Sequence, residues 1–197
     1  MAKISTYPVV APQGSDIIIG TDASDSNATK NFTVSSVLGL YEAPVAGWQR
    51  FDDDEFTSMN KLELLDGVVQ TLPNNGATSY SYGPHVFYDP STSKVLSLNE
   101  NDTYTITVVF RAEAPNANQT HLDIFLTSVS PTPYERLSDS MVFAKGNNTE
   151  QGFHLMYQYY ADADAVSSGI NVKIQSHGGT AYVWDIVYFI QRNQIAV

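Results

Sequence analysis

Hydrophobic side chains recur at every second position over most of this chain, a pattern typical of β-strands with one buried face. Tyr104, Ile106, Val108 and Phe110 alternate with polar residues, so residues 104–111 are predicted to form a half-buried strand. The same alternation predicts strands at 121–126, 153–159 and 170–175, and shorter apolar runs predict them at 47–51, 61–71, 85–88 and 136–143. Residues 182–192 are apolar on both faces apart from Asp185, so we expect a central strand there.

Turn-forming sequences separate these strands, and no helix is predicted between them. Clusters of Pro, Asn, Asp, Ser and Gly occur at 73–76, 89–91, 99–102, 146–148 and 177–179. Strands at this spacing indicate an all-β fold, an antiparallel β-sandwich. The jelly-roll type is favoured over an immunoglobulin-like sandwich, because an immunoglobulin-like domain would be shorter.

The first part of the chain follows a different pattern. Its apolar runs at 7–10 and 17–19 are short, and prolines and glycines interrupt the sequence around them. Residues 34–42 have apolar side chains at helical spacing with Thr33 as N-cap, so we predict a short helix that ends at Pro44. This is the only helix that the sequence indicates.

The chain is therefore predicted to have two parts: an extended N-terminal arm with the short helix at 1–44, and a jelly-roll domain at 45–197. The arm is too polar to build a core alone, so its apolar residues must be buried against a neighbouring copy or a larger assembly. Adding strands to a neighbour's sheet edge would achieve this. The expected assembly anchors are Tyr7, Pro8, Val9, Val10, Ile17, Ile18, Ile19 and Phe32.

Charge and composition narrow the classes of partner. A formal net charge of −11 argues against nucleic acid, because phosphate binding requires clustered Lys and Arg. The longest apolar run, 186–190, is too short to span a membrane, and no apolar signal segment follows Lys3. The absence of cysteine excludes disulfides, thiolate metal ligands and cysteine nucleophiles. We therefore expect neither a nucleic-acid nor a membrane partner.

Three groups of Asp, Glu and Asn residues are candidate ligands for a cation. The acidic run at 52–55 would suit calcium, but a solvated loop is the favoured interpretation. Asp22, Asp25 and Asn27 lack the glycine and the final glutamate of an EF-hand loop. Asp162 and Asp164 are a third candidate, again without a specific ligand spacing. None of these groups predicts a metal site.

The histidines have no recognisable metal-ligand spacing. They are His85, His121, His154 and His177, and a place on the surface or at a subunit contact is favoured for them. Several histidines that met around a symmetry axis could bind metal or sense pH. Taken alone, the sequence predicts no metal ion and no cofactor.

Motifs for catalysis are also missing from the sequence. It has no serine-nucleophile motif, phosphate loop or dinucleotide fingerprint, so we expect no catalytic residues and no enzyme. A catalytic pair of carboxylates for glycoside hydrolysis stays an open alternative, because two such residues can be distant in the sequence and close together in the folded protein. The clustered aromatic residues are expected to pack the sandwich or a subunit interface rather than sugar rings; they are Tyr80, Tyr82, Phe87, Tyr88, Tyr157, Tyr159 and Tyr160.

Two stretches resemble small structural proteins of tailed bacteriophages, particularly marine ones. In the arm, the match is Gly-Thr-Asp at 20–22 and, after a short turn rich in Asp and Asn, Thr-Lys-Asn-Phe-Thr at 29–33. The sandwich is similar at 143–146, in the strand around Phe153, and at 185–192. Together these stretches account for most of the chain, and the arm motif is the more distinctive.

The resemblance implies a virion protein, synthesised in the cytoplasm of a bacterial host, whose arm attaches to the particle and whose jelly roll projects. Because the chain has no repetitive shaft, we expect a capsid decoration protein or short head fibre that is bound to other virion proteins. The resemblance also implies a homo-oligomer, usually a trimer. The alternative is a tail-fibre or receptor-binding module at a virion tip, with a host-surface glycan as its partner. A glycan-active enzyme and a cytosolic jelly-roll protein unrelated to phage are further alternatives.

Overall fold

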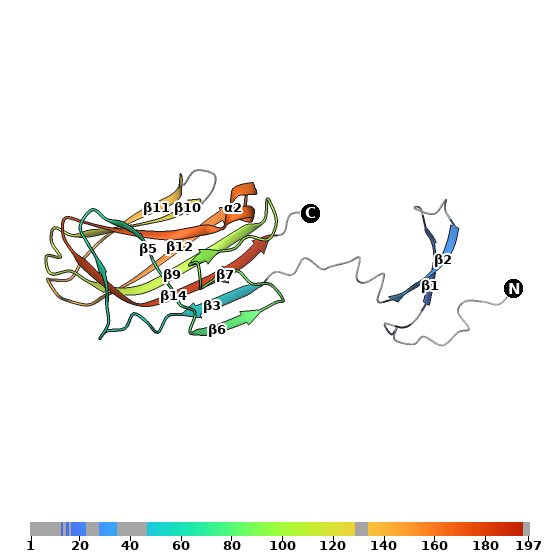
Figure 1. Ribbon diagram of the computed structural model, residues 1–197, viewed down its shortest axis with the longest axis horizontal. Helices are drawn as coiled ribbons and strands as arrows, with labels where there is room; N and C mark the ends of the chain where they lie inside the picture. The colour runs from blue at the N-terminus through green and yellow to red at the C-terminus, as the bar shows by residue number, and fades with distance from the viewer. Residues whose placement is uncertain are drawn as a thin grey trace. The chain divides into compact units, whose positions relative to one another are not determined.

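The computed structural model describes residues 13, 15, 17–22, 28–34, 47–128 and 134–194. The chain divides into two compact units, Met1–Pro44 and Val45–Val197. We describe each unit by itself (Figure 1).

The first unit contains an antiparallel hairpin. Strand β1 (Ile17–Asp22) pairs with β2 (Ala28–Thr33), and Ile18 lies directly opposite Phe32. A two-stranded hairpin alone is only marginally stable in water, so these strands gain from any further pairing. The predicted helix at 34–42 lies outside the described residues except for Val34.

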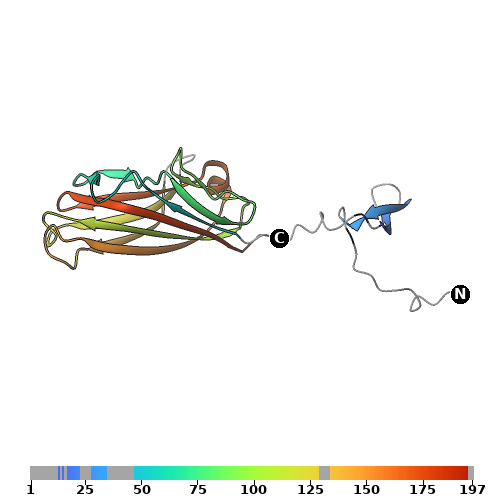
Figure 2. The ribbon, with the colours of Figure 1, turned by 90° about the horizontal axis from the view of Figure 1, so that it is seen from below.

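The second unit is a sandwich of two antiparallel sheets. In the β14 sheet, the order is β12 (Gln151–Tyr160), β9 (Thr103–Glu113), β14 (Ala181–Gln194), β3 (Trp48–Asp52) and β6 (Thr78–Tyr82), with β4 (Leu62–Leu64) on β14. In the β13 sheet, the order is β11 (Tyr134–Val142), β10 (His121–Ser128), β13 (Ile170–His177), β8 (Lys94–Val95) and β7 (Tyr88–Asp89), with β5 (Val69–Thr71) on β13. The long strands run along the length of the sandwich in both views (Figures 1 and 2).

The order of the strands is that of a jelly roll, which confirms the predicted fold class. In the β14 sheet, the first long strand β3 lies beside the last, β14, and β9 and β12 follow. In the β13 sheet, the short strands β5 and β8 lie beside the second-last strand β13, and β10 and β11 follow. The chain thus alternates between sheets so that early and late strands become neighbours, as in two interleaved Greek keys.

The core lies between the sheets, where the predicted alternation places it. Ile106, Val108, Leu122 and Ile124 are fully buried, as is Tyr188 from β14. The aromatic prediction is confirmed for part of its set, because Phe87, Tyr88, Tyr157 and Tyr159 are buried, whereas Tyr80, Tyr82 and Tyr160 are exposed.

Strand β14 is central, as predicted, since it pairs with both β3 and β9. Its one acidic residue, Asp185, has φ 51 and lies where the register shifts between Trp184 and Val187. The backbone N–H of Asp185 donates to Phe56 O at 3.0 Å, outside the ladder. A bulge of this kind turns a side chain out of the alternation, which explains how a carboxylate fits in an otherwise apolar strand.

The prediction of one strand at 61–71 is wrong. This segment forms β4 and β5, which pair with β14 and β13 respectively and therefore belong to different sheets. Asp66 and Gly67, with φ +73 at the glycine, turn the chain between them. Apolar residues on both sides of the Asp66–Gly67 turn suggested a single strand, although Leu65, Val68 and Val69 are exposed.

The expectation of only one helix is also wrong. Helix α2 (Ala163–Ser168) lies at one end of the sandwich (Figure 1). Asp162 is its N-cap and accepts a hydrogen bond from Ala165 N at 2.9 Å, and Gly169 ends it with φ 75. Among the described residues, no helix is long and apolar enough to cross a membrane.

Candidate interaction surface

Part of the outer side of the β14 sheet is mainly aromatic and apolar, and we call this part the β14 face. Alternation turns its side chains away from the core on all of the longer strands of that sheet. Three of its largest members are strongly exposed: Tyr80 (55%), Met156 (63%) and Tyr82 (66%). The β14 face comprises Trp48, Arg50, Asp52, Tyr80, Tyr82, Thr107, Val109, Met156, Val187 and Phe189.

Strand register assembles this face from segments that are far apart in the sequence. Met156 pairs with Thr107, Thr107 with Phe189, Phe189 with Arg50, and Arg50 with Tyr80. This row takes one residue from each of β12, β9, β14, β3 and β6. The pairings form a continuous surface across the sheet, which no single strand of the sequence could reveal.

The β14 face has no net charge. Arg50 Nε lies 2.8 Å from Asp52 Oδ1, so its two charged members form an ion pair with each other. Trp48 stacks on Phe189 with ring centroids 5.5 Å apart, which fixes both rings. In a chain of net charge −11, this is a surface suited to an apolar partner.

The structure places only some of the predicted anchors. Tyr7, Pro8, Val9 and Val10 lie outside the described residues. Ile17 and Ile18 are exposed and Phe32 is half-buried, and Ile19 belongs to β1 opposite Asn31. The hairpin thus brings Ile18 and Phe32 together in register and leaves apolar surface on β1.

The carboxylates in the acidic run at 52–55 accept hydrogen bonds from their own loop and from the turn at Asn75. Asp53 accepts hydrogen bonds from Phe56 N at 2.7 Å and from Asn75 N at 2.9 Å, and Asp54 accepts one from Asn75 Nδ2 at 2.7 Å. These carboxylates therefore stabilise two adjacent turns. Of the second acidic group, Asp25 and Asn27 lie outside the described residues.

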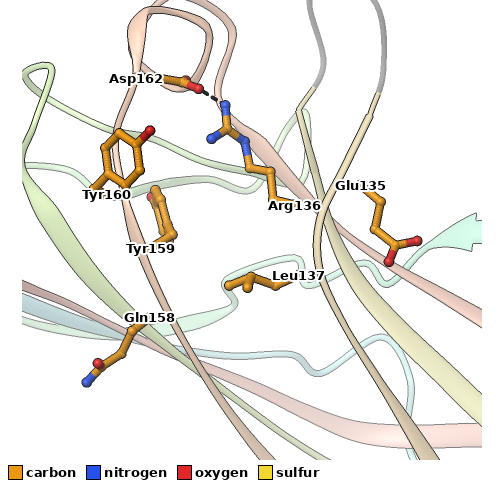
Figure 3. A pocket seen from close by; sticks show the side chains of 7 residues that line it. All are labelled: Glu135, Arg136, Leu137, Gln158, Tyr159, Tyr160 and Asp162. Carbon is orange, nitrogen blue, oxygen red and sulfur yellow. Dashed lines mark hydrogen bonds and ion pairs between the residues drawn. The ribbon is translucent and has the colours of Figure 1, made fainter.

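A hollow of about 330 Å³ lies beside β11 and β12 (Figure 3). Arg136 Nη2 lies 2.5 Å from Asp162 Oδ1, so the helix cap is also an ion pair. Glu135 points away from Asp162, and Arg136 lies between them (Figure 3). The two acids do not face each other across this hollow, as the carboxylates of a glycosidase must.

A neighbouring hollow of about 500 Å³ shares part of the same wall. Its lining includes Thr103, Tyr104 and Asn193 together with Gln158, Tyr159 and Tyr160. Tyr160 is exposed and lines both hollows, whereas Tyr159 is buried and its hydroxyl lies 3.1 Å from Ser97 Oγ. An exposed tyrosine between two hollows is the arrangement on which a sugar ring could stack.

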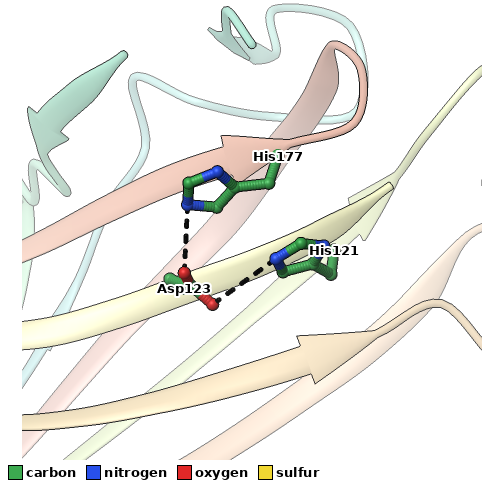
Figure 4. Close-up of side chains that lie close together, drawn as sticks. All are labelled: His121, Asp123 and His177. Atoms are coloured by element: carbon green, nitrogen blue, oxygen red, sulfur yellow. Dashed lines mark ion pairs between the residues drawn. The ribbon is translucent and has the colours of Figure 1, made fainter. Parts of the chain in front are cut away.

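The structure brings together two of the four histidines, His121 on β10 and His177 on β13 (Figure 4). Their rings stack with centroids 4.9 Å apart, and both approach the carboxylate of Asp123. His154 lies on β12, in the other sheet, and the ring of His85 lies 6.4 Å from that of Phe87. Sequence spacing could not find this cluster, because it depends on which strands pair and in what register.

No family model matches the chain, and no curated protein matches it at a significant level. Solved structures resemble it in fold. The PRD1 vertex protein P5 is 10% identical, with 98% of this chain and 88% of that one covered and a TM-score of 0.51. The Eiger TNF protein from S. frugiperda is 8% identical, with 78% and 96% covered and a TM-score of 0.49. A chain of the cowpea mosaic virus empty virus-like particle is 8% identical, with 76% and 79% covered and a TM-score of 0.28.

Viral capsid and vertex proteins and a TNF protein are thus among the structural neighbours of this chain. At identities of 10% or less, these likenesses concern the fold. Of the three, the likeness to P5 has a TM-score above 0.5, and it agrees with the jelly-roll topology derived from the strand order.

Proposed function

We propose that this protein is a structural, non-enzymatic component of a virus particle, in which copies of the sandwich associate and residues 1–44 attach them to other virion proteins. The observation that carries the proposal is the likeness of fold to the vertex protein P5, with a TM-score of 0.51. The phage motifs at 20–22 and 29–33 favour a bacteriophage capsid decoration protein or short head fibre.

Self-association is assigned to the β14 face. Copies of an acidic chain repel each other, and the repulsion is least where the surface charges cancel, as they do at Arg50 and Asp52. Burial of Tyr80, Tyr82 and Met156 would supply the apolar contact area that an oligomer interface needs. A closed cyclic oligomer, expected to be a trimer, is the assembly that buries such a patch on every copy.

Attachment is assigned to the first unit. The exposed Ile17 and Ile18 lie on a two-stranded hairpin whose outer strand edges can accept a further strand. Together with Tyr7, Pro8, Val9 and Val10, they would become buried on docking to a capsid or tail protein. The apolar area buried on docking would then offset the conformational entropy that the docked segment loses.

The self-association is tested by sedimentation of the purified chain and two variants. Wild-type protein is expected at a multiple of 21.6 kDa, threefold for a trimer, and Met156→Glu is expected to be a monomer. Val142→Glu is the matched control, because Val142 is equally apolar and exposed (71%) but lies on β11 of the other sheet. A wild-type monomer, or dissociation by Val142→Glu alone, would overturn the assignment to the β14 face.

The attachment is tested by particle assembly with the full chain or with residues 45–197. The shorter chain is expected to give the far-ultraviolet circular dichroism of a folded sandwich but to be lost from particles purified on a density gradient. Removal of residues 1–33 alone is expected to have the same effect. If either truncated chain is incorporated at the level of the full chain, the first unit is not the attachment device.

A second candidate function, host-glycan binding at a virion tip, is favoured by Tyr160. Its exposed ring lies between two hollows, where stacking on a sugar is sterically open. A glycan array is the test: binding by wild-type protein that Tyr160→Ala abolishes would support this function. An array without binding by wild-type protein would count against it.

A further inference from the structure

We propose that His121, Asp123 and His177 form a binding site for a divalent transition-metal ion such as Zn²⁺ on the outer face of the β13 sheet. Asp123 Oδ2 lies 3.0 Å from His177 Nε2, and Asp123 Oδ1 lies 4.0 Å from His121 Nε2. One ligand atom from each of the three residues can be chosen so that all lie within 4.8 Å of one another (Figure 4). This site lies on the opposite sheet from the β14 face and does not depend on the function proposed above.

The backbone pairing of two strands sets this geometry. His121 on β10 lies directly opposite His177 on β13, and Asp123 follows His121 by two residues, so all three side chains point to the same side of the sheet. Zinc bonds to His and Asp measure about 2.0–2.2 Å, which puts tetrahedral ligand atoms about 3.3 Å apart. The observed separations bracket that distance, and side-chain rotation closes the remaining gap, since all three residues are partly exposed.

The arrangement of the two rings agrees with a shared metal ion. The two imidazole rings lie nearly parallel, 15° apart, with centroids separated by 4.9 Å. A metal ion bound by both imidazoles and by the carboxylate would account for two rings that approach the same carboxylate.

Ser140 supports this interpretation from the next strand. Its hydroxyl donates a hydrogen bond to Asp123 Oδ1 at 2.5 Å, and Ser140 lies opposite Asp123 in the pairing of β10 with β11. Metal-bound carboxylates are commonly held by such a partner, which fixes their orientation and leaves the other oxygen for the metal. Here that other oxygen, Oδ2, is the one nearer to His177.

The donor set defines the class of ion. Two imidazole nitrogens and a carboxylate suit Zn²⁺, Cu²⁺ or Ni²⁺, whereas Ca²⁺ and Mg²⁺ require a shell made mainly of oxygens. Three protein ligands leave a coordination position for water or for a donor from another molecule. A bound ion would join β10 to β13 at the end next to the 177–179 turn.

The test is isothermal titration of Zn²⁺ into the full-length, untagged, chelator-treated protein. Wild-type protein is expected to bind one ion per chain, and His121→Ala and His177→Ala to lose detectable binding. Ser140→Ala is expected to bind about 10-fold more weakly, because it removes only the partner of a ligand. His154→Ala is the matched control, since His154 is an exposed histidine on β12 of the other sheet, and its affinity should equal that of wild type.

A second measurement separates loss of a ligand from loss of the fold. Electron paramagnetic resonance with added Cu²⁺ is expected to show coupling to two nitrogens in wild type and to lose this two-nitrogen signal in His177→Ala, while circular dichroism confirms that each variant is folded. The proposal is overturned if wild-type protein binds no Zn²⁺, or if His154→Ala weakens binding as much as His121→Ala does. It is also overturned if folded His121→Ala and His177→Ala retain wild-type affinity.

Discussion

Arg192 and Asp102 form an ion pair inside the sandwich, at the end of β14. Arg192 Nη2 lies 2.7 Å from Asp102 Oδ2, and the two side chains are 4% and 0% exposed. The same carboxylate oxygen accepts hydrogen bonds from Asn99 N and from the hydroxyl of Tyr104. A buried carboxylate with this many donors ties the 99–102 turn to the last long strand, and the cost of burying both charges is offset only while the pair is intact.

The substitution Asp102→Asn should therefore be strongly destabilising. It leaves the guanidinium of Arg192 buried without its counter-charge, for which we expect a loss of about 3–5 kcal/mol in the free energy of unfolding. Asp52→Asn is the matched control, because it removes one partner of the exposed pair with Arg50 and should cost about 0–1 kcal/mol. Urea unfolding measures both; equal losses in the two variants would contradict this account.

Several buried tyrosines make the stability of the sandwich sensitive to alkaline pH. Burial raises the pKa of Tyr88 and of Tyr104 to about 12, and raises that of Tyr188 well above its ordinary value. Below pH 10 these phenols are neutral in both the folded and the unfolded chain, so their contribution to the free energy of unfolding is fully present. Between the unfolded value of 10.0 and the folded value, only the unfolded chain loses its protons, so stability falls as pH rises.

The substitution Tyr88→Phe tests this linkage. At neutral pH the variant should lose about 1 kcal/mol, because the hydroxyl of Tyr88 no longer donates to Asn74 O. Above pH 10, its free energy of unfolding should fall less steeply than that of wild type. Urea unfolding over a pH series, with tyrosinate absorbance recorded in parallel, would reveal the difference; identical slopes would contradict it.

The turn between β13 and β14 can accept only glycine at position 178. Gly178 has φ +77, and a Cβ built on it would lie 2.0 Å from Gln119 O. Its N–H donates to Asp66 Oδ1 at 2.9 Å, so the turn also holds the crossing segment between β4 and β5. Only glycine satisfies both the backbone angle and the close approach.

Gly178→Ala should destabilise the sandwich by more than about 1 kcal/mol, because the alanine is strained at positive φ and its methyl group collides with backbone. Gly152→Ala is the matched control: Gly152 lies on β12 with nothing within 4 Å of its Cβ position. That change should stay within about 0.5 kcal/mol of wild type. Thermal unfolding of the two variants gives the comparison, and a neutral Gly178→Ala would refute the constraint.

Strict alternation predicted most of the long strands, and the run at 182–192 that is apolar on both faces predicted β14. Residues 104–111, for example, could face only one way, because a shift by one residue would expose Ile106 and Val108. The crossing at Asp66 was missed since both sides of it are apolar, and α2 was missed because it is too short and polar to show a helical period. Its one signal in the sequence is Asp162, a residue type that serves as an N-cap as readily as a cation ligand.

The candidate sites were harder to predict than the strands. Trp48, Phe189 and Met156 come onto one face only through the register of β12, β9, β14 and β3, and no local pattern in the sequence contains that register. The same is true of His121 and His177, which are far apart in the chain and directly opposite in the sheet. Alternation within a strand predicts which face of the sheet each residue occupies, whereas only the pairing between strands determines its neighbours.

At the scale of the whole molecule, the net charge of −11 opposes self-association at long range. Salt screens that repulsion, with a Debye length of about 30 Å at about 0.01 M and about 8 Å at about 0.15 M. The contacts of the β14 face are apolar and its ion pair is internal, so salt removes little of the attraction.

Association of wild-type protein should therefore strengthen as salt is added over this range. Sedimentation equilibrium at the two ionic strengths measures the dissociation constant, and Met156→Glu should stay monomeric at both. Weaker association at the higher salt would mean that oppositely charged surfaces hold the copies together, contrary to the proposed interface.

The position of β14 also sets when the chain can fold during its synthesis. Residues 181–194 lie between β3 and β9, so neither of those strands can complete its pairing until this late segment has left the ribosome. Until then, β9–β12 and β3–β6 are separate strand pairs, and part of their apolar inner sides stays exposed. A ribosome-bound chain that stops before residue 181 would therefore be a client for chaperones, and the sandwich would be completed only after residues 181–194 have emerged.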